Sequence, residues 1–410
     1  MTRLYAEMRR GQHNVKVLHV VYQFWPTRRG AVFRTLNVIK ATRQFGCKVV
    51  VVSSPFQRPA GSAGLEMLDS VRVYRTSHLG MGYGFEDAGG LLGRLRKLSA
   101  LPAFAKAVVS IARAENVDLL HANGTFFTGL AAIYAGQVLG LPTIYEVRSA
   151  WEVEALSGPA RWPQRAVAWL AEYAASHLAT WTVYNSARLE DHYRPRKDGQ
   201  SAVIYNALEW PAVPPSPPCG DPDMLRLGYV GSLVRYEGLD LLLAAVARLR
   251  AVGIPLHLDV VGAGPAETAL KSIARHLGVN SDVTFHGFLE GDDLECVWQR
   301  IDVLVLPRRR EPVTELVAGL KPLEAFKRAK CVVCSDVGGH REIIDHGETG
   351  LYFEAGNLDA LCDTLLRLYR DPELRARIGQ RAFELGRRRF GLERMARDYL
   401  VVYKAALGVC

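Results

Sequence analysis

The sequence has no apolar run that approaches the ~18 residues needed to cross a lipid bilayer, so no membrane-spanning helix is expected. Its first residues, MTRLYAEMRRGQHN, are charged and contain no apolar core, so no signal peptide is expected either. Cysteine is sparse, with seven residues in 410, and the odd number argues against a disulfide framework. These absences favour a protein of the cytoplasm, which is a reducing compartment.

Motifs that would hold a metal are also missing. Cys331 and Cys334 form a C-x-x-C, but they lie in the apolar run CVVCSD, where an offset of three places them on opposite faces of a strand. No second cysteine or histidine pair completes a zinc site, and no aspartate pair of the D-x-D type stands where it would serve a metal. We expect both thiols to pack in a core and no metal to be bound.

The sequence does contain an excess of positive charge. With 51 Lys and Arg against 42 Asp and Glu, its formal net charge is +9. Such a balance suggests anionic partners, which include nucleotide phosphates, anionic lipid and nucleic acid. A surface that is merely basic explains the charge equally well. Nucleic acid is not expected, because the chain lacks the array of basic and aromatic residues typical of its binders.

Short apolar runs alternate with amphipathic stretches along nearly the whole chain. This alternation is typical of parallel sheets covered by helices on both faces, so we expect an α/β protein with doubly wound sheets. The expected strands are 16–21, 48–53, 71–75, 118–121, 143–146, 180–184, 226–230, 256–261, 283–286 and 303–306, and the expected helices include 31–45, 91–115, 163–176, 239–252 and 266–277.

The alternation pauses at residues 210–223, whose sequence WPAVPPSPPCGDPD contains six prolines. No helix or central strand tolerates this, so we interpret the segment as a linker. We therefore expect two Rossmann-like domains, 14–209 and 224–389. Ligands of doubly wound sheets bind at the carboxyl ends of the strands, which predicts a cleft between the domains.

Two glycine-containing loops of the second domain follow strands. The run from Gly231 to Gly238 leads into a helix, and glycines together with a helix N-terminus favour phosphate. Arg235 would add a charge-assisted contact, although an ordinary strand-to-helix loop explains the pattern too. The run VGAGPAE at 261–267 begins like a dinucleotide fingerprint, but Glu267 replaces the third glycine, so we expect a tight turn rather than an NAD site.

The most informative segment runs from residue 307 to residue 357. A proline at the expected first position of a helix places Glu324 in the first turn, where a carboxylate suits the helix dipole or simply caps the helix. Lys321, just before this helix, is able to reach a diphosphate. Gly338 and Gly339 would offer backbone N–H groups. Together these groups suit a sugar joined to a phosphate.

Polar side chains also follow strands of the first domain. Arg34 lies one turn into a helix whose start favours phosphate. His121 ends the apolar run 118–121 and would face the cleft, although a lone histidine is more often structural. The next strand ends in YEVRSAWE, in which we expect Glu146, Arg148 and Trp151 to lie on the acceptor side.

Taken together, these motifs resemble the family 4 glycosyltransferases, which are retaining enzymes of the GT-B fold. The resemblance spans nearly the whole chain, and it implies that a C-terminal helix, 390–410, packs back on the first domain. It rests on a glycine-containing turn after the first strand, a His-x-His-like HAN, a G-x-L…G loop, a glutamate-containing segment leading to LEA, and the words SDVGG and ETGL. The YEGLD loop and the LKPLEA motif resemble a subgroup often associated with the assembly of polysaccharides or lipid-linked glycans.

The resemblance implies roles for the matching positions. Glu324 corresponds to the glutamate that binds the donor ribose, and Glu315 to an upstream glutamate near the donor sugar or phosphate. Gly30 corresponds to the glycine whose backbone faces the diphosphate. The other expected donor contacts are Arg34, Gly231, Ser232, Arg235, Lys321, Gly338 and Gly339, and the expected catalytic group comprises His121, Asn123, Glu315 and Lys321.

The chain also departs from the family pattern. Ser232 and Glu237 stand where the family usually has Arg and Lys, and Asn123 replaces the second histidine. The two glutamates are one residue further apart. We interpret the changes at Glu237 and Lys321 as a positive charge moved within one site, with Arg235 as a second substitute cation.

The resemblance implies transfer of a sugar from a nucleotide diphosphate sugar, with UDP or GDP as the nucleotide, without metal or cofactor. The acceptor would be a glycan, a lipid-linked molecule or a small molecule. Basic amphipathic stretches at 91–113 and 161–177 suit a peripheral site on an anionic membrane as well as they suit ordinary packing. The alternatives are a nucleotide-sugar epimerase of the same fold and a homologue that binds nucleotide sugars without catalysis.

Overall fold

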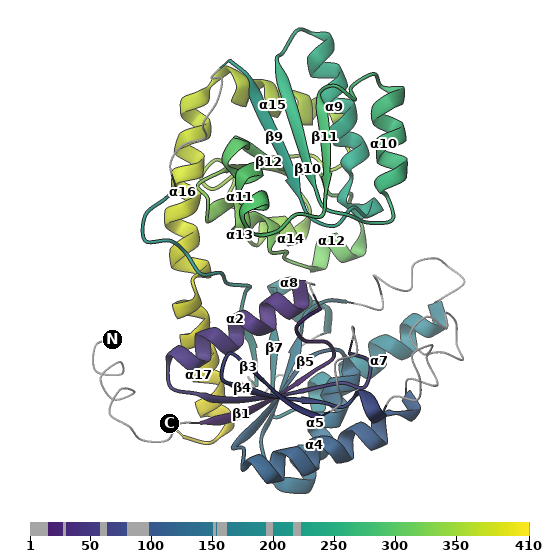
Figure 1. The fold of residues 1–410 in the computed structure, drawn as a ribbon, viewed down its shortest axis with the longest axis vertical. Coiled ribbons are helices and arrows are strands. Elements are labelled where there is room, and N and C mark those ends of the chain that lie inside the picture. Colours follow the sequence, from purple (N-terminus) through teal and green to yellow (C-terminus); the bar gives the residue numbers. More distant parts are fainter. Residues whose placement is uncertain are drawn as a thin grey trace. The chain divides into compact units, whose positions relative to one another are not determined.

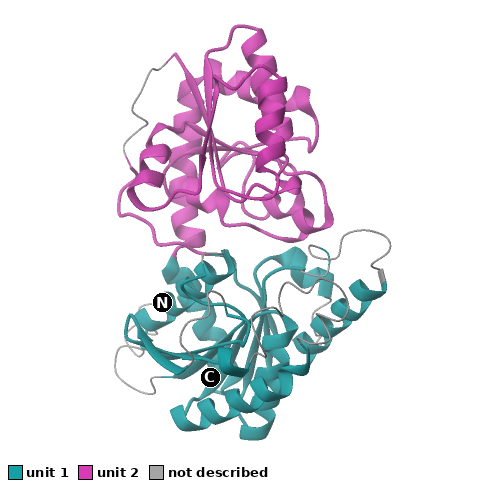
Figure 2. Ribbon diagram, turned by 45° about the vertical axis from the view of Figure 1, so that its right-hand side comes forward, with its two compact units in different colours: residues 1–206, 392–410 teal, residues 207–391 magenta. Residues whose placement is uncertain are grey.

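The computed structural model describes residues 15–27, 30–57, 64–79, 98–150, 153, 162–193, 200–215 and 223–409. The chain divides into two compact units, coloured separately in Figure 2. Unit 1 comprises residues 1–206 together with 392–410, and unit 2 comprises residues 207–391. Arg28 and Arg29, Trp151, and residues 91–97 and 161 of the two amphipathic stretches lie outside the described residues.

Unit 1 is built on an eight-stranded sheet. Its strands are β1 (Lys16–Val21), β2 (Lys48–Ser53), β3 (Gly64–Leu68), β4 (Val71–Arg75), β5 (Leu119–Gly124), β6 (Thr143–Val147), β7 (Trp181–Tyr184) and β8 (Ser201–Val203). The strand order is β3-β4-β2-β1-β5-β6-β7-β8, and every pair is parallel except β3 with β4. The order reverses at β1, which pairs with β2 on one side and with β5 on the other.

Helices cover both faces of this sheet. They are α2 (Gly30–Gln44), α4 (Leu101–Glu115), α5 (Phe126–Leu139), α7 (Trp162–Leu178), α8 (Ala187–Tyr193) and α17 (Leu392–Ala406). The last helix, α17, packs along α2, and the two lie side by side in Figure 1. The part of the stretch 91–113 that is described belongs mainly to α4, which buries Phe104, Ala105 and Val108.

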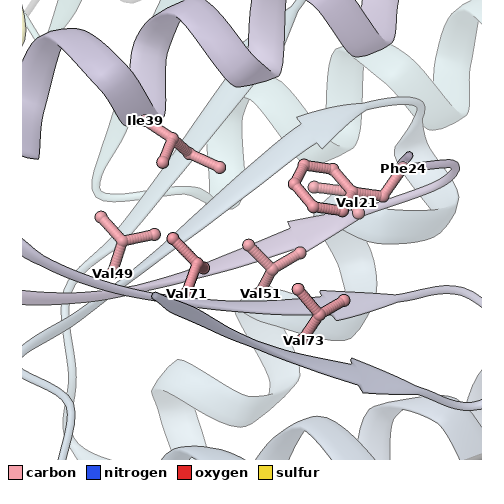
Figure 3. Packing of buried hydrophobic residues seen from close by; sticks show 7 residues of the cluster. All are labelled: Val21, Phe24, Ile39, Val49, Val51, Val71 and Val73. Carbon is pink, nitrogen blue, oxygen red and sulfur yellow. The ribbon is translucent and has the colours of Figure 1, made fainter. Parts of the chain in front are cut away.

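The core of unit 1 follows from runs of β-branched residues. The strand KVVVVS of β2 is buried at every position except its first, because a parallel strand is covered on both faces. Val49 and Val51 point to one side, where they meet Ile39 of α2 (Figure 3). The rest of this cluster is formed by Val21, Phe24, Val71 and Val73. Full burial of one such side chain contributes about 1.5–3 kcal/mol to folding.

Unit 2 contains a six-stranded, all-parallel sheet. Its strands are β9 (Leu225–Val230), β10 (Leu256–Val261), β11 (Val283–Gly287), β12 (Val303–Leu306), β13 (Cys331–Ser335) and β14 (Leu351–Phe353), in the order β11-β10-β9-β12-β13-β14. Its helices are α9 (Leu239–Ala251), α10 (Glu267–His276), α11 (Gly291–Arg300), α12 (Pro312–Leu316), α13 (Lys321–Phe326), α14 (Gly338–Arg341), α15 (Leu358–Arg370) and α16 (Pro372–Phe390), with the 3-10 turn η3 (Arg235–Glu237). In Figure 1, α10 and α16 flank this sheet on opposite sides.

The expected α/β fold with two doubly wound sheets is confirmed. Lys321 is the first residue of α13 rather than the residue before it, and another short helix, α12, lies between β12 and α13. Cys331 and Cys334 are buried in β13, as expected of packing residues. The described part of the proline-rich segment, residues 210–215 and 223, contains neither helix nor strand.

Two further features concern membranes and metals. None of the helices in the described ranges combines the length and the hydropathy that a membrane span requires. Among the same residues, no three His, Cys, Asp or Glu side chains gather closely enough to ligate a metal ion.

Candidate functional site

The strand order of unit 2 reverses at β9, which lies between β10 and β12. Loops that leave the carboxyl ends of two such strands diverge and open a crevice, where ligands of doubly wound sheets bind. The loop after β9 carries Gly231 and Glu237, and the loop after β12 begins with Pro307 and Arg308. We therefore take this edge of unit 2 as its candidate ligand site.

The two loops are fixed to each other through their backbones. The Arg309 N–H donates to the carbonyl oxygen of Tyr236 at 2.8 Å. Gly238 has a φ of +73°, and a Cβ atom there would lie 2.1 Å from the carbonyl oxygen of Pro307. Glycine is thus required for this close approach. The approach places Glu237 beside Arg308.

Glu237 lies between two cations. Its Oε1 is 2.6 Å from the Lys321 ammonium and 3.2 Å from a terminal nitrogen of Arg308, and its Oε2 accepts from Arg308 Nε at 3.3 Å. Only 2% of Glu237 and 8% of Arg308 is exposed to solvent. These three groups, called the Arg308–Glu237–Lys321 cluster below, carry a net charge of one positive unit.

The ionisation of this cluster follows from burial and from the neighbouring charges. Burial alone would raise the pKa of Glu237, but Arg308 and Lys321 overcome burial and lower this pKa to about 2. Burial lowers the pKa of Lys321 to about 8, against the opposing effect of Glu237. Burial and the Arg308 charge lower the pKa of the adjacent His340 to about 3, so this histidine is neutral at pH 7.

The Lys321 side chain runs over a turn that only glycine permits. A Cβ atom on Gly231 would lie 2.2 Å from Lys321 Cε and 2.9 Å from its Nζ. The ammonium donates to the Tyr229 hydroxyl at 2.8 Å and lies 4.9 Å from the centre of that ring. The Tyr229 hydroxyl in turn donates to the carbonyl oxygen of Ser232 at 2.8 Å. The turn after β9 and the start of α13 are thereby joined through one lysine.

The other expected donor contacts lie in the same unit. Ser232 and Arg235 are exposed in the loop after β9. Glu324 lies in the first turn of α13, where its carboxylate pairs with Arg328 at 3.2 Å and is 39% exposed. The structure thus brings the Gly231 turn and Lys321 together, with the partly exposed Glu324 three residues further along α13.

Two residues that were expected to contact the sugar donor, Gly338 and Glu315, bind each other instead. The N–H of Gly338 donates to Glu315 Oε2 at 2.9 Å, and Gly339 is buried. This corrects the expectation that the Gly338 N–H faces a ligand, because an acceptor within the protein already occupies it. Glu315 also pairs with Arg310 at 2.7 Å. Glu315 therefore connects α12 with the start of α14.

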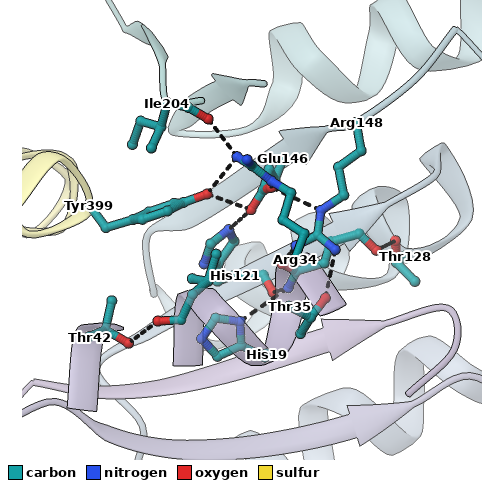
Figure 4. Close-up of polar contacts among 12 residues, drawn as sticks. His19, Arg34, Thr35, Thr42, His121, Thr128, Glu146, Arg148, Ile204 and Tyr399 are labelled. Atoms are coloured by element: carbon teal, nitrogen blue, oxygen red, sulfur yellow. Dashed lines mark hydrogen bonds and ion pairs between the residues drawn. The ribbon is translucent and has the colours of Figure 1, made fainter. Parts of the chain in front are cut away.

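In unit 1 the strand order reverses between β1 and β5, and a buried polar cluster lies beside this point (Figure 4). Glu146 on β6 is its centre, with no exposed surface. One carboxylate oxygen accepts from Arg34 and, at 2.8 Å, from Arg148. The other accepts from Tyr399 of α17 at 2.8 Å and lies 3.1 Å from His121 Nε2. Burial alone would raise the pKa of Glu146, but Arg148 and Arg34 hold it well below its usual range.

The guanidinium of Arg34 donates to four acceptors in this cluster. Besides Glu146, it donates to Asn206 at 3.1 Å, to the carbonyl oxygen of Ile204 at 2.6 Å and to the Tyr399 hydroxyl at 3.1 Å. With 2% of the residue exposed, it has no surface for a phosphate. The expectation that Arg34 contacts the donor is therefore wrong. Gly30, at the start of the same helix, is exposed.

His121 and Asn123 are also interior groups. His121 has no exposed surface, and its Nδ1 lies 2.9 Å from the Tyr403 hydroxyl. Burial lowers the pKa of His121, so the ring is neutral at pH 7. Asn123 donates to the carbonyl oxygen of His121 at 2.8 Å and accepts from Arg148 at 2.5 Å. The expectation that His121 faces a cleft is corrected, because its ring packs against α17 instead.

Arg148 likewise belongs to the interior, since it also donates to Thr35 and to the carbonyl oxygen of Ala31, both at 2.6 Å. Sequence reasoning did not identify Arg308, His19, Tyr399 or Tyr403 as parts of these clusters. The tyrosines were recognisable only as two aromatic residues four apart on one face of a helix. His19 was recognisable as the polar residue within the otherwise apolar run 17–21 of β1. The centres of its ring and of the His121 ring lie 4.7 Å apart.

Comparison with known proteins agrees with the two-unit architecture. Residues 28–209 match the family described as Glycosyltransferase Family 4, and residues 221–385 match the one described as Glycosyl transferases group 1. An uncharacterised glycosyltransferase of Methanocaldococcus jannaschii is 30% identical over 182 residues, which are 44% of this chain and 44% of that protein. The match thus spans less than half of the relative's length.

Solved structures share the fold. A sucrose-phosphate synthase from Thermosynechococcus elongatus superposes with a TM-score of 0.76 at 20% identity, covering 96% of this chain and 99% of that one. HepE from Anabaena, in complex with UDP-glucose, superposes with a TM-score of 0.67 at 19% identity, covering 95% and 99%. The architecture is that of GT-B proteins, and the chain belongs to the family 4 glycosyltransferases.

Proposed function

We propose that this protein transfers a sugar from a nucleotide diphosphate sugar, with UDP or GDP as the nucleotide, to a glycan, lipid-linked or small-molecule acceptor. The observation that carries the proposal is the Arg308–Glu237–Lys321 cluster beside the Gly231 turn, at the switch point of unit 2. A net positive charge at such a crevice favours an anionic ligand. Family membership and the UDP-glucose complex of HepE support a nucleotide sugar as that ligand.

Transfer requires stabilisation of the charge that develops on the departing diphosphate. A preorganised cation does this best, since it needs no reorganisation during the reaction. Lys321 is held by Tyr229 and Glu237 and is the cation nearest the Gly231 turn. We assign it to the diphosphate and the partly exposed Glu324 to the ribose. Because Lys321 and the N-terminus of α13 can provide the positive charge, the proposed reaction needs no metal.

We further propose that the sugar is transferred with retention of its anomeric configuration. Front-face attack, with the leaving phosphate as base, needs no protein nucleophile. His121 and Asn123 are buried, and their side chains cannot reach a sugar outside the protein. This is compatible with such a reaction, because it requires no attack by a protein side chain on the sugar. In this proposal, His121 and Asn123 support the buried groups Glu146 and Arg148, and they are not catalytic residues.

Of the three kinds of acceptor, we favour a lipid-linked one, used in cell-surface polysaccharide or glycoconjugate assembly at the cytoplasmic face of a membrane. Support comes from α7, on which Val167, Leu170 and Leu178 are 70%, 59% and 57% exposed. Spacings of three and eight residues place them along one side of a helix. The net charge of +9 favours an anionic surface as the place where this side binds.

A thermal-shift panel of UDP-glucose, GDP-mannose, ADP-glucose and TDP-glucose tests the donor site. We expect one of them to raise the melting temperature by several degrees at millimolar concentration, since a ligand that binds only the folded state stabilises it. If none does, the function is wrong. Incubation of the selected donor with acceptor extracts, with and without EDTA, followed by NMR of the product anomer, tests transfer, metal independence and retention. Release of an isomerised nucleotide sugar would indicate an epimerase instead.

A further inference from the structure

The Arg308–Glu237–Lys321 cluster contains a carboxylate where a diphosphate-binding site needs positive charge. We propose that Glu237 is a positioning residue that holds Lys321 protonated and aimed at the donor diphosphate, so that the lysine at the start of α13 takes the place of a cation in the loop after β9. This inference rests on the proposed function. It goes beyond that function by naming Glu237 as the residue that keeps Lys321 charged and thereby makes donor affinity depend on pH.

The hydrogen bonds of Lys321 leave one donor for a ligand. An ammonium group has three N–H donors. One is directed at Glu237, 2.6 Å away, and one at the Tyr229 hydroxyl, 2.8 Å away. Within the described part of the chain the third has no acceptor, and 17% of the side chain is exposed. A phosphate oxygen is the acceptor that suits this N–H best, because the bond would join two opposite charges.

The direction of the lysine is fixed from several sides. Its stem crosses Gly231 so closely that a Cβ atom there would overlap Cε, and its ammonium lies over the Tyr229 ring. Glu237 is in turn held by two contacts to Arg308 and by the backbone junction between its loop and Pro307. The lysine therefore needs little reordering when a ligand binds, which favours affinity.

Glu237 also decides whether the lysine is charged. The groups that face Lys321 are Arg308 from the end of β12, Glu237 from η3, Tyr229 from β9 and His340 from α14. Tyr229 and His340 are neutral at pH 7, because burial raises the pKa of the tyrosine and lowers that of the histidine. Arg308 repels the ammonium. Glu237 is thus the single negative group among these neighbours, and without it Lys321 would lose its proton more readily.

The test is a pH profile of donor affinity by isothermal titration calorimetry. The probe is UDP-glucose, or GDP-mannose if the panel selects it, because the phosphates of a nucleotide sugar do not titrate near neutral pH. Burial holds the pKa of Lys321 at about 8 in the free protein. We expect the wild-type affinity to be constant from pH 5.5 to 7 and to fall as the pH rises above about 8. An affinity that stays constant up to pH 9 overturns the inference.

Three variants sharpen the test. Glu237→Gln should weaken binding about five- to tenfold at pH 7.5, in proportion to the smaller protonated fraction of Lys321. At pH 5.5 the loss should shrink to about twofold or less, since the lysine is protonated again. Lys321→Arg, whose charge is fixed, should remove the pH dependence. Glu348→Gln is the matched control, because it removes a carboxylate from the exposed pair with Arg381 in the same unit.

The outcomes separate this inference from the function on which it rests. If no nucleotide sugar binds the wild-type protein, both are wrong. If one binds but Glu237→Gln binds it as well as wild type at pH 7.5, the function stands and the inference is wrong. A loss of affinity that is equal at pH 5.5 and pH 7.5 indicates only a structural role for Glu237 and also overturns the inference. Should Glu237→Gln fail to fold, the wild-type and Lys321→Arg profiles decide.

Discussion

The Tyr399 hydroxyl on α17 donates to Glu146 on β6 at 2.8 Å, although 253 residues separate the two in the sequence. The same hydroxyl accepts from Arg34 on α2. The last helix therefore supplies one partner of the buried Glu146 carboxylate, and another α17 residue, Tyr403, lies 2.9 Å from His121. Unit 1 thus takes the polar partners in its interior from both ends of the chain.

Tyr399→Phe should lower the free energy of unfolding by about 1–2 kcal/mol, because the hydroxyl serves two buried charged groups that lose a partner when it is removed. Urea unfolding followed by circular dichroism measures the change. Tyr134→Phe is the matched control, since this tyrosine on α5 is 45% exposed and should change stability little. Equal stability of the two variants would show that the Tyr399 hydroxyl contributes nothing.

Glu146→Gln should destabilise the protein by about 3–5 kcal/mol, because it leaves Arg34 and Arg148 as buried charges without a counter-ion. Glu348→Gln is the control, since the pair of Glu348 with Arg381 is exposed on both sides and is worth at most about 1 kcal/mol. A comparable loss in both variants would contradict the central role of Glu146 in the cluster.

Acid should lower the free energy of unfolding of the protein through the Glu146 carboxylate. Its pKa is held well below the ~4.3 of an unfolded chain, so the unfolded state binds more protons as the pH falls. The stabilisation is complete above about pH 5 and is lost progressively below it, by up to about 1.4 kcal/mol per pH unit. Wild type should therefore lose more stability than Glu146→Gln between pH 5 and pH 3. Parallel pH curves would contradict the shifted pKa.

Gly231→Ala should weaken donor binding at least about tenfold, which corresponds to about 1.4 kcal/mol. The new methyl group would overlap Lys321 Cε and force the lysine out of its position. Gly287→Ala is the control: this glycine also has a positive φ, but nothing lies within 4 Å of a Cβ atom there. Calorimetric titration with the donor compares them. Unchanged affinity in Gly231→Ala would show that Lys321 does not need this turn.

Asn123→His, which restores the usual family residue, should lower stability by about 1–3 kcal/mol and should not raise turnover. The asparagine both donates to the His121 carbonyl and accepts from Arg148, and an imidazole ring cannot occupy the same volume with both bonds intact. Thermal unfolding and initial rates test this. A stable variant with faster transfer would show instead that Asn123 reduces activity.

Binding to anionic membranes should depend on the exposed side of α7. Val167→Glu combined with Leu170→Glu should abolish co-sedimentation with vesicles of phosphatidylglycerol and phosphatidylcholine, because it replaces exposed apolar groups with charges that anionic lipid repels. The control, Val401→Glu, alters an exposed apolar residue of α17 (64% exposed) and should leave binding unchanged. Vesicle binding that survives the α7 substitutions would exclude this side.

The local pattern determined much of the fold. Runs such as KVVVVS and VLVL predicted the bounds of β2 and β12 correctly, because β-branched residues in short apolar runs favour buried parallel strands. Two edge strands of unit 1, β3 and β8, escaped prediction. The edge strand β3 is GLEML, without a β-branched residue and with most positions exposed, and β8 has only three residues. Their pairing depends on the neighbouring strand rather than on their own composition.

The sequence by itself determined the family, the two doubly wound sheets, and the idea that a charge moved between Glu237 and Lys321, since motif words and periodicity are local properties of the chain. Only the tertiary structure decided which charges meet. It places Arg308 beside Glu237 and pairs Arg34 with Glu146. It also covers His121 with α17, whose Tyr403 contacts the histidine ring. The physical reason is that a buried charge is stabilised by partners within a few ångströms, and strand order, not sequence distance, sets those partners.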